Sequence, residues 1–217
     1  MNDVLLRMAS VEQDARRLLE IYAPYVENTA VTSEETVPSL EEFKGRITDA
    51  LRRHPYIVCI IDGDIVGYAY GHSYRSRSSY RWGAELSVYV AADCKSSSVG
   101  VALYGALIAT LRLQGYQTAY GIVLLPNLPS QRLHEYLGFS AKGVLTNACC
   151  KLGGWHDIVT YERHIGTFPQ NPPEIVPVSD LDDWDMREIF NRHASVVSNR
   201  KTILRLNKSR NGFWVIP

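Results

Sequence analysis

The sequence lacks a long apolar run and a net charge, and each absence counts against one class of partner. No apolar stretch approaches the roughly 20 residues that cross a bilayer. The first residues show no basic segment followed by an apolar core, so we expect no signal peptide. The formal net charge is +0, so no overall field attracts nucleic acid or a membrane surface. We therefore expect no membrane partner, and nucleic acid is not the expected ligand.

Cysteine is scarce and lacks the spacing of a metal site. The four cysteines do not pair with one another or with histidine at zinc-ligand spacing, so we expect no metal. Three of them lie in or beside apolar stretches, which favours buried, reduced thiols: the four are Cys59, Cys94, Cys149 and Cys150. A reducing cytoplasm fits this pattern.

The apolar periodicity predicts strands and helices in the order β α α β β β α β α β β. The first half is typical of an antiparallel meander, and the second half contains strand–helix–strand units, which require right-handed crossovers. The predicted strands are 4–8, 56–61, 65–70, 85–90, 119–125, 144–151 and 156–161, and the main helices are 11–23, 40–51, 99–113 and 127–137. We predict an α/β (α+β) fold with a mixed, mainly antiparallel central sheet and helices on both faces.

The composition changes after Gly166, where three prolines interrupt residues 167–173. We predict a domain over residues 1–166, a Pro-rich linker over 167–180 and a C-terminal extension over 181–217. We expect the region after about Pro173 to be dispensable for the chemistry. Residues 181–193 could form a helix. Residues 200–210 hold five basic and no acidic side chains. A solvated tail and a nucleic-acid- or partner-binding element are the alternatives there.

A polar loop of small residues lies between a predicted strand and a predicted helix. Free backbone N–H groups and the helix dipole favour an anion at such a place, and Lys95 adds a positive charge. A plain loop capped by Ser98 is the alternative. The loop comprises Lys95, Ser96, Ser97, Ser98, Val99 and Gly100.

Polar residues on both sides of this loop in the sequence have a structural and a functional interpretation. Asn127 can cap the helix that follows or bind a ligand, and Ser130 lies in its first turn. His134 is on the same helix and can be structural or catalytic. Glu85 begins a β-rich run, where an inward-facing carboxylate must be paired or have a shifted pKa, while a strand-edge residue would face solvent.

Together these residues resemble the GNAT superfamily of N-acetyltransferases, in particular its phosphinothricin and methionine sulfoximine acetyltransferase branch. The resemblance covers about residues 5–165. It rests on the order of Glu85, the polar loop and His134, and on the segments Leu125-Pro126-Asn127, Pro129-Ser130, Arg132-Leu133-His134-Glu135 and Gly153-Gly154-Trp155-His156-Asp157.

The resemblance implies the chemistry and the site. Acetyl-CoA would be the donor, and a primary amine, of an amino acid or an analogue, the acceptor. Glu85 would be the base, and His134 would protonate the thiolate or assist that base. The loop 95–100, Asn127 and Ser130 would bind CoA, and the backbone of Val88, Tyr89 and Val90 the thioester. Arg75, Arg77 and Tyr80 would bind the acceptor. A homodimer is also implied.

The sequence departs from the family pattern at two places. Ser98 replaces the first glycine of the phosphate loop, and a serine presents its N–H there only if its φ suits an L-residue. Ser33 and Glu35 stand where relatives often carry aromatic residues near the acceptor. Three alternatives therefore stay open: a binding module with weak or lost CoA use, a polyamine acetyltransferase, and a peptide acetyltransferase.

Overall fold

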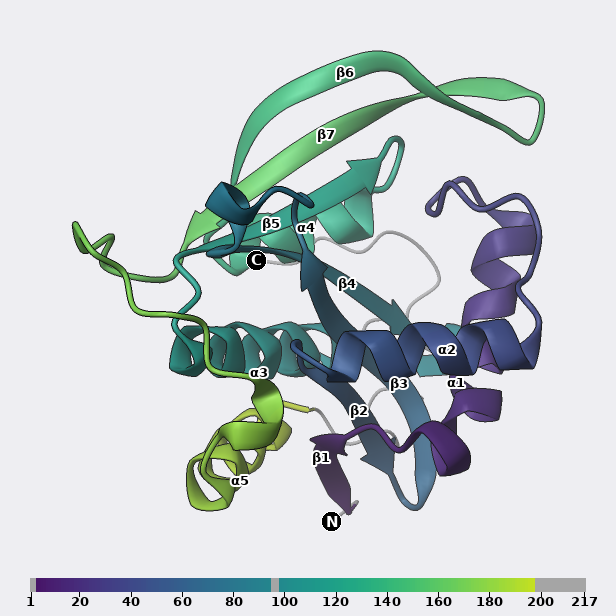
Figure 1. The fold of residues 1–217 in the computed structure, drawn as a ribbon. Helices are drawn as coiled ribbons and strands as arrows, with labels where there is room; N and C mark the ends of the chain where they lie inside the picture. Colours follow the sequence, from purple (N-terminus) through teal and green to yellow (C-terminus); the bar gives the residue numbers. More distant parts are fainter. Residues whose placement is uncertain (1–2, 95–97, 198–217) are drawn as a thin grey trace.

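The computed structural model describes residues 3–94 and 98–197, which form one seven-stranded sheet with five α-helices. The element order is the predicted one (Figure 1). The strands are β1 (Val4–Met8), β2 (Tyr56–Ile61), β3 (Asp64–Ser73), β4 (Gly83–Val90), β5 (Thr118–Leu124), β6 (Ser140–Lys151) and β7 (Gly154–His164). The helices are α1 (Val11–Asn28), α2 (Leu40–Leu51), α3 (Val99–Gln114), α4 (Leu128–Tyr136) and α5 (Asp183–Ala194).

The sheet is mixed and mainly antiparallel, as predicted. Its strand order is β1-β2-β3-β4-β5-β7-β6, and β4 and β5 are the one parallel pair in the described residues. Alternate residues of the strands feed two apolar cores on opposite faces. Ala84 and Leu86 lie in the core beneath α3, whereas Val58 and Tyr68 lie in the core beneath α1 and α2.

Local sequence signals explain where the first two helices begin. The Ser10 hydroxyl accepts the Gln13 N–H, and the Ser39 hydroxyl accepts the Glu42 N–H, so each serine caps the helix that follows it. The first helix was expected to end at Pro24, but α1 continues to Asn28. Proline removes one hydrogen bond from a helix, and the burial of Tyr22 and Val26 on the sheet keeps the chain helical beyond it.

The segment that we expected to be a linker lies against the domain. It is extended, as its prolines predict, yet hydrogen bonds and an ion pair anchor it to the domain. The Trp82 Nε1 donates to the Pro173 carbonyl at 2.8 Å, and Arg81 pairs with Glu174 at 3.0 Å. The Phe168 N–H donates to the Gln117 Oε1 at 2.9 Å. Residues 167–176 therefore form part of the surface near the start of β4 and β5.

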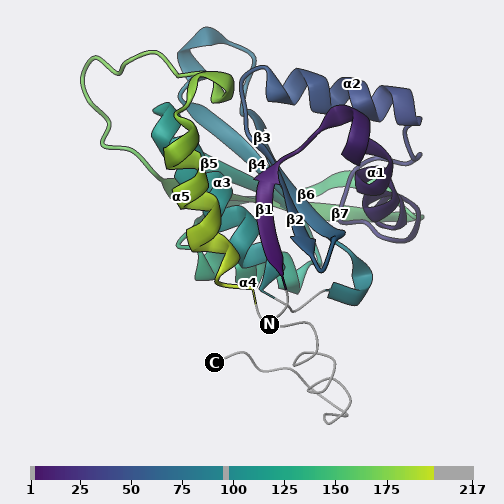
Figure 2. The same cartoon turned by 90° about the horizontal axis from the view of Figure 1, so that it is seen from below.

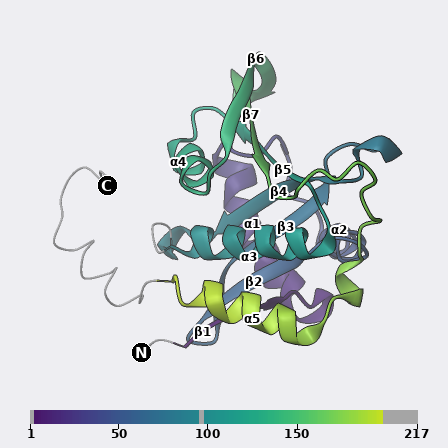
Figure 3. The same cartoon turned by 90° about the vertical axis from the view of Figure 1, so that its left-hand side faces the viewer.

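Helix α5, which lies in the expected C-terminal extension, packs on the same core as the domain. It runs beside α3 and reaches β1 (Figures 2 and 3). Its side chains Met186 and Phe190 are buried in the core beneath α3. The approach to α3 is close, because a Cβ on Gly105 would lie 2.5 Å from the His193 Nδ1. The domain therefore includes α5, and the expected boundary at residue 166 does not coincide with the edge of the core.

No helix in the described residues is long and apolar enough to cross a membrane.

We predict that Phe190→Ala lowers the free energy of unfolding by about 3 kcal/mol, since it empties a buried aromatic site. Denaturant unfolding measures the change. The control is Glu188→Ala, an exposed residue of the same helix, for which a change within about 0.5 kcal/mol is expected. Equal effects of the two variants would mean that α5 is not part of the cooperative core.

Candidate active site

The two parallel strands at the centre of the sheet separate after a short stretch of pairing. β4 and β5 are paired from Gly83 to Glu85 only, with Glu85 opposite Tyr120. Beyond this point β4 continues to Val90 beside β3, and β5 continues to Leu124 beside β7. We call this the β4–β5 divergence, defined by residues 86–90 of β4 and 121–124 of β5. It leaves one edge of each strand without a strand partner.

The backbone of β4 faces the divergence at every second residue. The Ala91 N–H donates to the Val66 carbonyl on the β3 side, so alternation directs the backbone groups of Val90, Val88 and Leu86 to the other side. Side chains cover two of these carbonyls. The Tyr104 hydroxyl donates to Leu86 at 2.9 Å, and the Tyr25 hydroxyl donates to Val90 at 2.5 Å. The N–H groups of Val88 and Val90 remain directed into the divergence.

Helix α3 begins at the same end of β4. Its N-cap, Ser98, has φ +60° and ψ +4°, the left-handed conformation that favours glycine, and its side chain makes no capping bond to the described residues. The Ser98 side chain therefore does not cap the first N–H groups of α3, and uncapped N–H groups at a helix start suit an anion. Val99 is buried under the sheet, which fixes the helix start. Lys95, Ser96 and Ser97 lie outside the described residues.

Glu85 lies at the apex of the divergence. Its side chain is 23% exposed, and its Oε1 lies 3.5 Å from the Nε2 of His72, the opposite residue on β3. Burial raises the pKa of the Glu85 carboxyl above its ordinary value, and the electrostatic effect of His72 opposes that rise. A partly desolvated carboxylate with a raised pKa has the properties that general-base catalysis needs.

His134 is enclosed by protein rather than open to the divergence. It is 2% exposed, with its Nδ1 2.7 Å from the Ser130 carbonyl and its Nε2 3.2 Å from the Tyr104 hydroxyl. A Cβ on Gly121 would lie only 2.1 Å from the Nε2, so that glycine makes room for the ring. Burial lowers the pKa of His134, and the bond to the Ser130 carbonyl opposes this. The ring links α4 to α3 and β5.

Asn127 and Ser130 occupy the start of α4. The Asn127 side chain is the N-cap and accepts the Ser130 N–H at 3.2 Å, which is the capping interpretation. The Ser130 hydroxyl lies 3.4 Å from the His134 Nδ1. Both residues are engaged within α4 and are partly exposed.

The predicted acceptor residues lie together in the connection between β3 and β4. The Arg75 guanidinium lies 5.1 Å from the Tyr74 ring centre and 5.3 Å from that of Tyr80. Arg77 is the residue before the 3₁₀ turn Ser78–Tyr80 and is exposed. Ser33 and Glu35 are exposed in the connection between α1 and α2.

Sequence reasoning missed His72, Tyr104 and Tyr120, which surround Glu85 and His134. The pairing of His72 with Glu85 depends on the register across a long β3–β4 connection, and no turn motif fixes that register. Tyr104 is one apolar position among many in α3. Only the small Gly121 within a strand signalled a close approach.

The chain matches the model of the acetyltransferase (GNAT) domain over residues 8–160. It is 31% identical over 168 residues to the phosphinothricin N-acetyltransferase of Streptomyces viridochromogenes, covering 77% of this chain and 91% of that protein. It is 32% identical over 155 residues to the L-methionine sulfoximine/L-methionine sulfone acetyltransferase of Pseudomonas paraeruginosa, covering 70% of this chain and 90% of that protein.

A solved structure has the same fold. It is the crystal structure of a GNAT superfamily phosphinothricin acetyltransferase from Sinorhizobium meliloti in complex with acetyl-CoA. The TM-score is 0.76 at 30% identity, and the match covers 81% of this chain and 97% of that one. The β4–β5 divergence, the open start of α3 and the match to these proteins agree, and the chain belongs to the GNAT family of acetyltransferases, enzymes that use acetyl-CoA as the acetyl donor.

Proposed function

We propose that the enzyme acetylates the α-amine of a free amino acid or amino-acid analogue at the β4–β5 divergence, with Glu85 as the general base. The observation that carries this proposal is the position of Glu85, the last residue of β4 that pairs with β5. Beyond it the backbone of β4 is open to a thioester, and beside it a polar acceptor region begins.

The donor site is formed mostly by backbone. The N–H groups of Val88 and Val90 are directed into the divergence and can stabilise the oxyanion that develops on the thioester oxygen. The free N–H groups at the start of α3, together with Ser98, Val99 and Gly100, suit the pyrophosphate of CoA. Lys95 would add positive charge to this region.

The acceptor must reach the thioester as a neutral amine. A free amine is mostly protonated at pH 7, so the reaction needs a base, and Glu85 is the carboxylate at the apex of the divergence. It would take the proton directly or through a water molecule. His72 lies next to it and holds its orientation.

His134 has a positioning role in this proposal. It is enclosed by protein, and its ring nitrogens face the Ser130 carbonyl and the Tyr104 hydroxyl. Tyr104 in turn bonds to the Leu86 carbonyl at the divergence. The His134 ring therefore fixes the hydroxyl that borders the thioester site.

The acceptor class is supported by two features. The relatives are named for phosphinothricin and for methionine sulfoximine, which are amino-acid analogues. The exposed guanidinium groups of Arg75 and Arg77 lie in one connection with the Tyr80 hydroxyl, and a guanidinium holds a carboxylate through two parallel hydrogen bonds. A polyamine offers no carboxylate for them.

We predict that Glu85→Gln lowers kcat at pH 7 by about 10²–10⁴-fold with an amino-acid acceptor, because one general base is removed. The loss should shrink as pH rises, since the acceptor amine then loses its proton to solvent. A pH–rate profile by thiol release measures both. A loss that stays constant with pH would mean that Glu85 is not the base.

The same variant carries its own folding control. A raised carboxyl pKa means that the folded state disfavours the charged form, so ionised Glu85 costs stability once the pH exceeds that pKa. Glutamine cannot ionise. Glu85→Gln should therefore melt at the same temperature as the wild type or a higher one at pH 7, which separates lost chemistry from lost structure.

We predict that Ser98→Gly raises the free energy of unfolding by about 0.5–1 kcal/mol, because it relieves a left-handed L-residue. Ser98→Ala is the matched control and should stay near the wild type, since the hydroxyl makes no cap. The melting temperature of both variants should still rise with the acetyl-CoA concentration. A stability loss in Ser98→Gly, or no acetyl-CoA effect in any form, would contradict the proposed donor loop.

We further propose that the enzyme is a cytoplasmic homodimer joined along β6. This strand is the edge of the sheet, and ten of its twelve residues, 140–148 and Cys150, are exposed (Figure 1). Leu145 is 62% exposed, and Val144, Tyr136 and Trp155 are exposed nearby. An open edge with apolar side chains favours pairing with a second copy. The cysteines form no disulfide among the described residues, which suits a reducing compartment.

Light scattering should give twice the chain mass of 24.5 kDa for the wild type and 24.5 kDa for Leu145→Glu. Leu113→Glu, at an exposed position on α3, should leave the wild-type mass unchanged. A monomeric wild type would contradict the dimer.

A further inference from the structure

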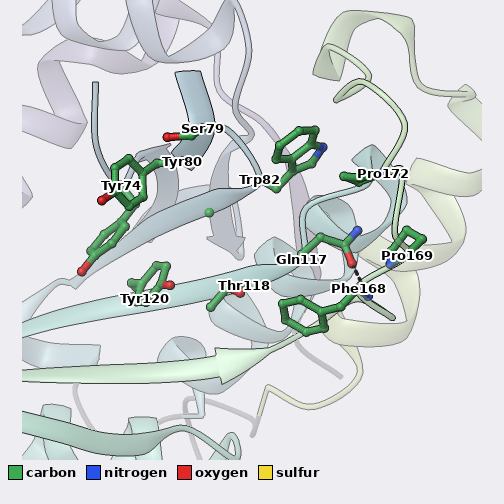
Figure 4. Close-up of a pocket in the computed structure, with 11 residues that line it drawn as sticks. Tyr74, Ser79, Tyr80, Trp82, Gln117, Thr118, Tyr120, Phe168, Pro169 and Pro172 are labelled. Atoms are coloured by element: carbon green, nitrogen blue, oxygen red, sulfur yellow. Dashed lines mark hydrogen bonds between the residues drawn. The ribbon is translucent and has the colours of Figure 1, made fainter. Parts of the chain in front are cut away.

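A cavity of about 420 Å³ is partly built by the C-terminal segment (Figure 4). Tyr74 and Tyr80 come from the β3–β4 connection, Trp82 precedes β4, and Tyr120 belongs to β5. Phe168 forms part of the wall from beyond residue 160, where the match to the GNAT model ends. The volume of the cavity is in the range of small-molecule sites.

The cavity continues directly from the proposed base. Gly83 lines the cavity and lies two residues before Glu85 on the same face of β4, a distance of about 7 Å along a strand. Tyr120 lines it as well and is opposite Glu85 in the sheet. A group attached to an amine at Glu85 would therefore extend into this space.

The lining is aromatic and neutral. The described residues that form it include five aromatic rings and no acidic or basic side chain, and its polar groups come from residues such as Ser79, Gln117 and Thr118. A charged side chain of an acceptor would find no opposite charge there, whereas a flat apolar ring would stack on the walls.

Two guanidinium groups border the cavity and count against a cation inside it. Arg75 lies over Tyr74 and Tyr80, and Arg81 lies 3.8 Å from the Trp82 ring centre. These rings therefore already carry a cation on one face. A second cation would meet repulsion, but the carboxylate of an amino acid would be attracted to Arg75.

The backbone of Phe168 is held in an unfavourable conformation. Its φ is +53°, a rare value for a bulky residue, and its side chain is 51% exposed, so burial within the chain does little to offset the strain. Gln117 maintains this conformation, with its Oε1 accepting the Phe168 N–H and its Nε2 donating to the Gly115 carbonyl. An exposed ring fixed at a cavity wall is available for a ligand.

We propose that this cavity is the acceptor side-chain subsite and that it selects an α-amino acid with a planar aromatic side chain. The amine lies at Glu85, the carboxylate lies at Arg75, and the ring stacks among Tyr80, Trp82 and Phe168. The C-terminal segment is thus a specificity element. This inference rests on the proposed function and names its acceptor.

The test compares kcat/KM for L-phenylalanine, L-tyrosine and L-tryptophan with that for methionine sulfoximine, phosphinothricin, spermidine and a lysine-containing peptide. The aromatic amino acids should be preferred by about tenfold or more. Phe168→Ala should raise KM for L-phenylalanine about tenfold with little change in kcat, since one stacking partner is lost. Phe168→Leu should give a KM for L-phenylalanine between those of the wild type and Phe168→Ala. Trp184→Ala, which removes an exposed aromatic side chain on α5, should have the KM of the wild type.

Binding of L-phenylalanine by calorimetry in the presence of CoA gives a readout that does not depend on turnover. Preference for methionine sulfoximine or phosphinothricin, or an unchanged KM in Phe168→Ala, would overturn the aromatic subsite and leave the proposed function intact. Preference for spermidine or the peptide would overturn both the subsite and the amino-acid acceptor. No turnover with any amine would defeat the proposed function, and the calorimetry would then decide the subsite alone.

Discussion

The separation of two parallel strands is the constraint on which the rest of the site depends. Backbone N–H and C=O groups inside a sheet need partners, and β4 loses its partner on one side after Glu85. The protein satisfies the Leu86 and Val90 carbonyls with the Tyr104 and Tyr25 hydroxyls. Those partners come from opposite faces of the sheet, α3 and α1, so both helix layers are needed to keep the strands apart. The N–H groups left between them suit a thioester.

The same separation explains why one carboxylate is unusual. Glu85 is at the apex, flanked by His72 on β3 and Tyr120 on β5, and it is too buried to be fully hydrated. The resulting rise in its pKa brings the carboxyl nearer to the working pH than a surface glutamate would be. His134 shows the opposite case. Burial lowers the pKa of His134, and its ring lies against the Tyr104 hydroxyl and positions it. In the proposed function Glu85 and His134 therefore have different roles because their surroundings differ.

The sequence predicted the element order, the mixed sheet and several helix ends, because these depend on local signals. Serine caps at positions 10 and 39 and glycine after α3 act within a few residues of themselves. Family motifs then located Glu85 and His134. The sequence could not predict that β4 and β5 separate after three pairs, that His72 faces Glu85, or that His134 is enclosed. Each of these results from contacts between segments far apart in the chain. The prolines of 167–173 predicted an extended segment correctly, but proline content carries no information about whether such a segment is anchored.

Because residues 167–176 are anchored to the domain, substrate choice and acetyl transfer can depend on different parts of the chain. The proposed donor site and the proposed base, Glu85, belong to β4, β5 and α3, all within the residues that match the GNAT model. Phe168 and the prolines that follow lie beyond that match, and they contribute one wall to a cavity that begins two residues from the base. Changes in this segment alter the shape and polarity of the wall without moving Glu85 or the thioester site. A short addition held by Gln117, Trp82 and Arg81 can therefore change which side chain is accepted while the acetyl transfer itself stays the same.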